Sequence, residues 1–260
     1  MELDFLNGIE TLTDISENIN SNMEKHKIKF VVNSHVDYME DSLKLMLPYI
    51  LREIPTDEIM VVIGGNDKEE TIIKYDIPFH FVDYNAYDFH SFIYIVENRE
   101  VVEGFDYIFY LHDTCLPLHD FRRLAYNFQS GVKTYSAWNK SNSNLGLYSV
   151  NHLFENMNNI IGKYKYIPTG KIGQSLEDSL TVAKHTNAYN FHYTLAEKGI
   201  GDALVQVGEP EKQGAEGFPF GYKDVYHTGV ARRCMLYRNL NLAKFKTFSD
   251  GTNGYGGTRK

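Results

Sequence analysis

The sequence predicts an α/β fold with a mixed, mostly parallel central sheet flanked by helices. Runs of about five apolar residues, rich in β-branched and aromatic types, alternate with stretches in helical spacing. Polar residues follow the ends of the strongest runs, where parallel sheets bind their ligands. The length of 260 residues suits one such domain.

The expected strands are the apolar runs themselves. The first, IKFVVN at 28–33, opens into a polar loop, and the second, at 59–63, stops at Gly-Gly-Asn-Asp. A short strand is expected at 79–82, and the strongest at 107–112. Another is expected at 145–150. Each combines strand-favouring residues with turn residues at its end.

Helices are expected between these strands. Apolar residues recur at helical spacing over 39–54, where Pro48 should kink or shorten the helix. Further helices are expected at 91–103, 151–162 and 176–199. This alternation of strands and helices is typical of a doubly covered sheet.

Composition argues against several classes of protein. The net charge is −8, from 26 basic and 34 acidic residues, so a nucleic-acid partner is not expected. The two cysteines, Cys115 and Cys234, make no disulfide framework and do not have the spacing of a zinc ribbon. The acidic N-terminal stretch is no signal peptide, and no run approaches the ~20 apolar residues of a transmembrane helix. A cytoplasmic protein without a membrane span is therefore expected.

Three positions carry candidate chemistry. Asp113, following the strongest strand, is placed to hold Mg²⁺ or Mn²⁺ through oxygen, or simply to cap the next turn. Glu177 and Asp178 suit a general base, or the capped first turn of a helix. His227 is either a packed polar residue or a ligand completing the metal shell begun by Asp113.

Taken in chain order, four segments resemble the GT-A glycosyltransferases. The family's Asp-x-Asp metal motif is matched by Leu111-His112-Asp113, with Leu111 in place of the first Asp. A glycine-containing acceptor loop is matched by NLGLYS at 144–149, and the x-Glu-Asp motif by LED at 176–178. A C-terminal metal-binding histidine is matched by His227. The resemblance spans residues 28–235.

The resemblance implies a GT-A-like (Rossmann-like) fold and a metal-dependent glycosyltransferase, more in keeping with the inverting type. Such an enzyme moves a sugar from a nucleoside-diphosphate sugar to an acceptor hydroxyl on a glycan, with Mn²⁺ or Mg²⁺ as cofactor. It further implies that Asp113 and His227 hold the metal, and that Asp178, or Glu177 beside it, is the catalytic base.

By the same resemblance, residues at the strand ends bind the donor. Asn33, Ser34 and His35 would lie beside the base, Asp67 near the base or ribose, and His112 beside Asp113 in the donor site. An ordinary turn is the other interpretation of Asp67. Basic residues near the C-terminus either contact the diphosphate or form a solvated basic face: Arg232, Arg233, Lys244 and Lys246.

The resemblance also divides the chain. A single catalytic domain over 1–260 would hold a nucleotide-sugar-binding half at 28–113 and an acceptor half at 114–235, followed by a tail at 236–260. Two other functions stay open. One is a degenerate nucleotide-sugar- or glycan-binding module, because the first Asp is missing. The other is a metal-dependent phosphohydrolase using His112-Asp113, although such pairs normally sit on helices.

Overall fold

The structure is a computed structural model that describes part of the chain. The described residues are 26–84, 86, 90–126, 134–136, 145–155, 188–190, 204–206, 233–237 and 240–246.

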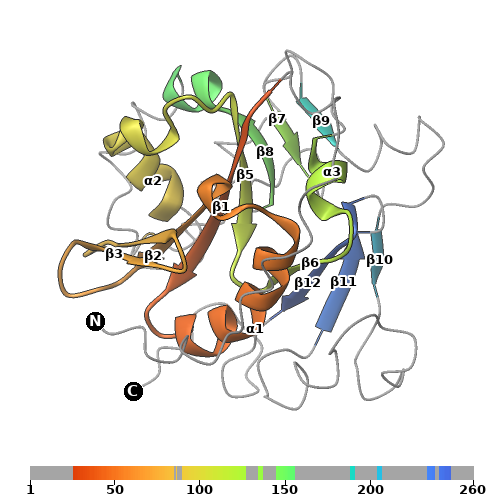
Figure 1. Ribbon diagram of the computed structural model, residues 1–260, viewed down its shortest axis with the longest axis horizontal. Coiled ribbons are helices and arrows are strands. Elements are labelled where there is room, and N and C mark those ends of the chain that lie inside the picture. The colour runs from red at the N-terminus through yellow and green to blue at the C-terminus, as the bar shows by residue number, and fades with distance from the viewer. Residues whose placement is uncertain are drawn as a thin grey trace.

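A mixed sheet runs through the described part of the chain in the strand order β3-β4-β2-β1-β5-β8-β7-β9 (Figure 1). At its centre β4, β2, β1 and β5 are parallel neighbours, whereas β3 and β8 pair antiparallel on either side. The strand bounds are β1 Ile28–His35, β2 Ile59–Gly64, β3 Glu70–Lys74, β4 Ile77–Phe81, β5 Tyr107–His112, β7 Thr134–Ser136, β8 Gly146–Ser149 and β9 Ala188–Asn190. The predicted α/β class with a mixed, mostly parallel central sheet is confirmed.

The predicted strands are present with small shifts. The strands expected at 28–33 and 59–63 run one or two residues further, to His35 and Gly64. The strand at 107–112 is confirmed, and the one at 79–82 begins earlier, at Ile77. These runs are buried on both faces, and continuous apolar runs are what such strands require.

Strand β3 was not predicted, because ETIIK lacks a continuous apolar run. It forms a hairpin with β4, and the connecting residues Tyr75 and Asp76 both have positive φ, 54° and 59°. Two consecutive residues with positive φ are typical of the type I′ turn, whose twist suits a two-residue hairpin.

Helices pack on both faces of this sheet. They are α1 Met39–Glu53, α2 His90–Glu97 and α3 Phe121–Ala125, with 3₁₀ turns η2 Thr56–Glu58 and η4 Arg99–Val102. Pro48 was expected to kink or shorten the first helix, and the shortening is wrong, because α1 continues through Pro48 to Glu53. The backbone hydrogen bond that Pro48 removes is outweighed by the burial of apolar side chains before and after it. These are Leu43, Met46, Leu47 and Ile50.

Two further helix predictions need correction. The helix expected over 91–103 ends as an α-helix at Glu97 and continues as η4. The helix expected over 176–199 is wrong at Ala188–Asn190, which form β9 and pair in parallel with β7. Pairing with a distant strand has overridden the local helical pattern there. Residues 150–155 are helical, as expected for the start of 151–162.

A second, antiparallel sheet brings the C-terminal part of the chain to the central one. Its order is β10-β11-β12-β6, with β6 Cys115–Pro117, β10 Leu204–Gln206, β11 Arg233–Tyr237 and β12 Leu242–Lys246. β6 begins two residues after Asp113, and its Cys115 pairs with Lys244 of β12. This pairing places β12 beside the end of β5 (Figure 1).

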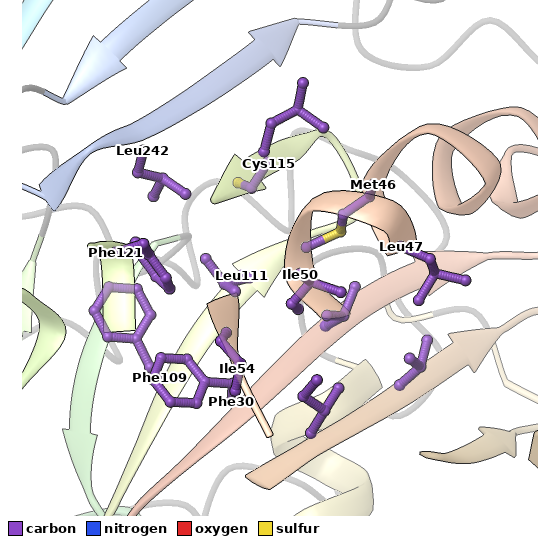
Figure 2. Packing of buried hydrophobic residues seen from close by; sticks show 14 of the residues in the cluster. Phe30, Met46, Leu47, Ile50, Ile54, Phe109, Leu111, Cys115, Phe121 and Leu242 are labelled. Carbon is purple, nitrogen blue, oxygen red and sulfur yellow. The ribbon is translucent and has the colours of Figure 1, made fainter. Parts of the chain in front are cut away.

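The core has two layers, one on each face of the central sheet. Figure 2 shows the first layer, in which Met46 and Ile50 of α1 pack near Leu111 and Cys115. Phe30, Phe109 and Phe121 form an aromatic group in this layer, with ring centroids 5.3–5.8 Å apart. The second layer packs α2 against the other face of β1, β2 and β5. Among the described helices, none combines the length and apolarity that a bilayer crossing requires.

Candidate functional site

The carboxyl ends of β1, β2 and β5 meet at one edge of the sheet. In the parallel ladders, Asn33 pairs with His112 and His35 pairs with Gly64, so the polar residues that follow each strand lie together. In open α/β sheets this edge is where ligands bind. The site is therefore built by neighbouring strands that are far apart in the sequence.

Asp113 and Ser34 make direct contact at this edge. The Ser34 hydroxyl donates to Asp113 Oδ2 over 2.7 Å, and the Asp113 backbone N–H donates to the Asn33 carbonyl over 3.1 Å. Asp113 is half-buried, immediately beyond β5. Two consecutive residues of β1 thus hold both the backbone and the carboxylate of Asp113.

Leu111, where the family motif has its first Asp, is a core residue. It is fully buried in the layer that α1 covers (Figure 2). An ionised carboxylate at this position would lose its water without a charged partner from the surrounding aliphatic and aromatic side chains, which is strongly unfavourable. The buried surroundings of Leu111 therefore suit an apolar side chain and disfavour an aspartate.

Asn33 ties β1 to α2. Its side-chain oxygen accepts hydrogen bonds from the backbone N–H and the hydroxyl of Ser91, at 3.1 and 2.8 Å. Because Ser91 lies in the first turn of α2, Asn33 satisfies one of the backbone donors that a helix N-terminus leaves over. The predicted contact of Asn33 with a nucleoside base would have to share this oxygen.

Two glycines at the end of β2, Gly64 and Gly65, make room for two imidazole rings. A Cβ on Gly64 would overlap the ring of His90, and a Cβ on Gly65 would overlap Nε2 of His35. Gly65 also has a φ of +78°, which disfavours other residues. The Gly-Gly pair after an apolar run was the sequence signal for this close packing.

His35 is held on its other side by the residue two positions on. Its Nδ1 accepts the Asp37 backbone N–H over 3.2 Å and lies 3.4 Å from the Asp37 carboxylate. Burial lowers the pKa of His35, and the charge of Asp37 opposes this shift. A neutral ring with its proton on Nε2 follows from this hydrogen bonding.

Lys244 brings a positive charge to the same edge. It pairs with Cys115 where β6 and β12 meet, and Cys115 is two residues after Asp113. Burial raises the pKa of the Cys115 thiol to about 11, while the charges of Lys244 and Asp113 act on it in opposite directions. Cys115 is therefore an inert thiol, as expected for a buried cysteine.

The structure describes two of the other predicted site residues, Asp67 and His112, and leaves the side chains of the rest undescribed. Asp67 is exposed in the bend after β2, where the Asn66 side chain donates to the Lys68 carbonyl over 2.7 Å, as in an ordinary turn. His112 is the last residue of β5 and meets the Tyr110 ring edge-on at 5.5 Å. Four predicted residues lie outside the described part of the chain: Glu177, Asp178, His227 and Arg232. The side chains of Arg233 and Lys246 are likewise not described.

The chemistry of Asp113 fits a hard divalent cation. Mg²⁺ and Mn²⁺ favour carboxylate oxygens and commonly take one or two protein carboxylates together with phosphate oxygens. Within the described residues, no three His, Cys, Asp or Glu side chains gather around one point. A metal at this edge would therefore depend on Asp113 together with ligands from the substrate or from undescribed residues such as His227.

The comparisons with known proteins identify fold neighbours only. A crystal structure of the galactosyltransferase LgtC in complex with donor and acceptor sugar analogs shares 12% identity, covering 62% of this chain and 72% of that one, with a TM-score of 0.38. An active-site mutant of LgtC shares 10% identity, covering 87% and 92%, with a TM-score of 0.41. No protein-family model and no curated protein matches the sequence. At this level of identity the likeness concerns the fold alone.

Proposed function

We propose that this chain is a glycosyltransferase that uses Mn²⁺ or Mg²⁺ to transfer a sugar from a nucleoside-diphosphate sugar to a hydroxyl of a glycan acceptor. The observation that carries the proposal is the contact between Ser34 and Asp113 where β1 and β5 end. It joins an oriented carboxylate to the sheet edge at which α/β folds bind nucleotides. Asp113 also occupies the position of the second acidic residue in the motif that this sequence resembles.

Charge at this edge suits a departing diphosphate. When bound, a divalent cation offsets the negative charge that develops on the leaving group. Asp113 would hold it, joined by His227. Lys244 supplies a protein cation on β12, the strand that pairs with β6 just after Asp113. Groups of this kind act strongly because they are oriented before the reaction begins.

The acceptor side of the proposal rests on Asp178. Its carboxylate would remove the acceptor proton as the acceptor oxygen attacks the anomeric carbon, with Glu177 as the alternative base. A base opposite the leaving group leads to inversion. His35 and Asp67 would lie beside the nucleoside, and one domain would hold both substrates.

The phosphohydrolase alternative is less well supported. His112 and Asp113 sit where β5 ends, and not on a helix as such metal-binding pairs normally do. A binding module without turnover would show donor binding but no transfer, so an assay of sugar transfer separates it from the enzyme.

The proposal is tested by replacing Asp113 with Asn, which nearly preserves shape while removing the charge. Thermal unfolding is followed with a panel of nucleotide sugars, with and without Mn²⁺. A donor that binds only the native state raises the melting temperature by mass action. We expect one donor to stabilise the wild type by several degrees in the presence of Mn²⁺, and this shift to disappear in Asp113→Asn.

The matched control is Asp76→Asn, which removes an exposed carboxylate in the β3–β4 turn. It should keep the full donor shift. An undiminished shift in Asp113→Asn, or no response of the wild type to any nucleotide sugar, would contradict the proposed function.

A further inference from the structure

We infer that Ser34 is a positioning residue for Asp113, and that its hydroxyl orients the carboxylate toward the metal. The inference rests on the proposed function and refines it. Resemblance placed Ser34 beside the nucleoside base, whereas the structure places its hydroxyl on the carboxylate proposed to bind the metal.

The geometry of the contact supports this role. The distance from Ser34 Oγ to Asp113 Oδ2 is 2.7 Å, which is within the range for a hydroxyl that donates to a carboxylate. Ser34 is only 3% exposed, so water has little access to replace its hydroxyl. The bond is therefore a fixed part of the site.

Asp113 needs such an anchor because of where it stands. It lies beyond the last residue of β5, where the ladder no longer restrains the chain on both sides. The Asn33 carbonyl holds its backbone N–H at 3.1 Å, and Ser34 then restrains rotation of the carboxylate. Both restraints come from consecutive residues of β1, which is itself paired on both edges.

An oriented carboxylate matters for metal affinity. Residues that hydrogen-bond a ligating side chain typically contribute about 10–100-fold to affinity, because an unrestrained ligand must be ordered when the metal binds. The competing explanation is that Ser34 only stabilises the fold, like any buried hydroxyl with a partner.

A variant of Ser91 distinguishes these two explanations. Ser91 is 0% exposed, and its hydroxyl donates over 2.8 Å to the side chain of Asn33, the residue before Ser34. Removing either hydroxyl leaves a comparable gap and an acceptor that has lost a donor. Of these two hydroxyls, it is that of Ser34 that contacts Asp113.

The experiment measures the dissociation constant for Mn²⁺ alone, from the electron paramagnetic resonance signal of the free ion. Thermal unfolding without metal reports separately on the fold. We expect Ser34→Ala to weaken Mn²⁺ binding about 10–100-fold. Ser34→Thr, which keeps the hydroxyl, and Ser91→Ala should both stay within about threefold of the wild type.

The outcomes distinguish the inference from the proposed function. If Asp113→Asn abolishes Mn²⁺ binding while Ser34→Ala matches the wild type or Ser91→Ala, the inference is wrong and the proposed function stands. If Asp113→Asn binds Mn²⁺ like the wild type, both fail. Should Ser34→Ala not fold, Ser34→Cys replaces the hydroxyl by a much weaker donor of similar size. Mn²⁺ affinity should then fall, and unchanged affinity in that variant would overturn the inference.

Discussion

Asn33, Ser34 and His35 follow one another in β1, and each contacts a different neighbour at the edge of the sheet. Asn33 binds the start of α2, Ser34 binds Asp113, and His35 packs against Gly65. Alternation along a strand sends successive side chains to opposite faces, so three consecutive residues reach separate partners. At this scale, the site consists of contacts that each depend on a single side chain.

The catalytic prediction also belongs to single residues. Asp178→Asn keeps the shape of the side chain but removes a basic oxygen, so donor binding should survive. Transfer should fall by about 10²–10⁴-fold, the usual contribution of a general base. Rates of sugar transfer, together with thermal shifts caused by the donor, check this expectation.

Glu177→Gln is the parallel control for the neighbouring carboxylate. Near-normal transfer by Asp178→Asn, together with a collapse in Glu177→Gln, would move the base to Glu177. If both variants stayed fully active, neither residue would be the base, and a capping role would suffice, since Asn caps a helix well.

At the scale of elements, the loop after β2 is shaped by the rings beneath it. Gly65 combines a φ of +78° with a site where a Cβ would overlap His35. The loop is also pinned by backbone bonds from Gly65 to Tyr84 and from Asn66 to Val82, at 2.9 and 3.0 Å. The loop therefore has little room to relax.

Gly65→Ala should consequently destabilise the protein by about 2–4 kcal/mol, which combines backbone strain and overpacking. Gly104→Ala is the matched control, because Gly104 has a φ of +80° but no atom within 4 Å of the point that a Cβ would occupy. It should cost only about 1–2 kcal/mol of strain. Denaturant unfolding of the two variants measures the difference.

A double variant tests whether overlap with the His35 ring causes the extra destabilisation in Gly65→Ala. Adding His35→Ala to Gly65→Ala should recover the part of the loss that comes from overlap with the ring, but not the part from strain. Equal losses in Gly65→Ala and Gly104→Ala would instead mean that the His35 ring moves aside without cost.

At the scale of the whole molecule, stability should depend on pH through His80. This side chain is 7% exposed, and its Nδ1 lies 2.9 Å from the Thr71 hydroxyl and 2.8 Å from the Tyr94 hydroxyl. Burial, assisted by the charge of Lys29, lowers the pKa of His80 to about 4. The folded protein therefore holds His80 neutral at a pH where the unfolded chain protonates it.

The direction follows from proton binding. An unfolded histidine binds its proton near pH 6.5, so below that pH the unfolded state gains protons that the folded state refuses. The contribution of His80 is thus complete above about pH 6.5 and declines toward pH 4, by up to about 3 kcal/mol. His80→Gln should flatten the loss of unfolding free energy between about pH 6.5 and pH 4.

His119→Gln serves as the control, since that side chain is 83% exposed. Its profile of unfolding free energy against pH should follow the wild type. Parallel profiles for His80→Gln and the wild type would show that His80 is not the titrating group.

The sequence by itself determined the central strands, the edge at which they end, and the placement of Asp113 at that edge. These features are local, because apolar runs, strand propensity and turn residues are all read within a few positions. The tertiary structure decided the rest: that Ser34 contacts Asp113, that Leu111 faces the core, that 188–190 joins the sheet as β9, and that Lys244 stands opposite Cys115. Each of these depends on which distant segments pair, and that choice is made by the free energy of the whole packed chain, to which the local pattern contributes only a part.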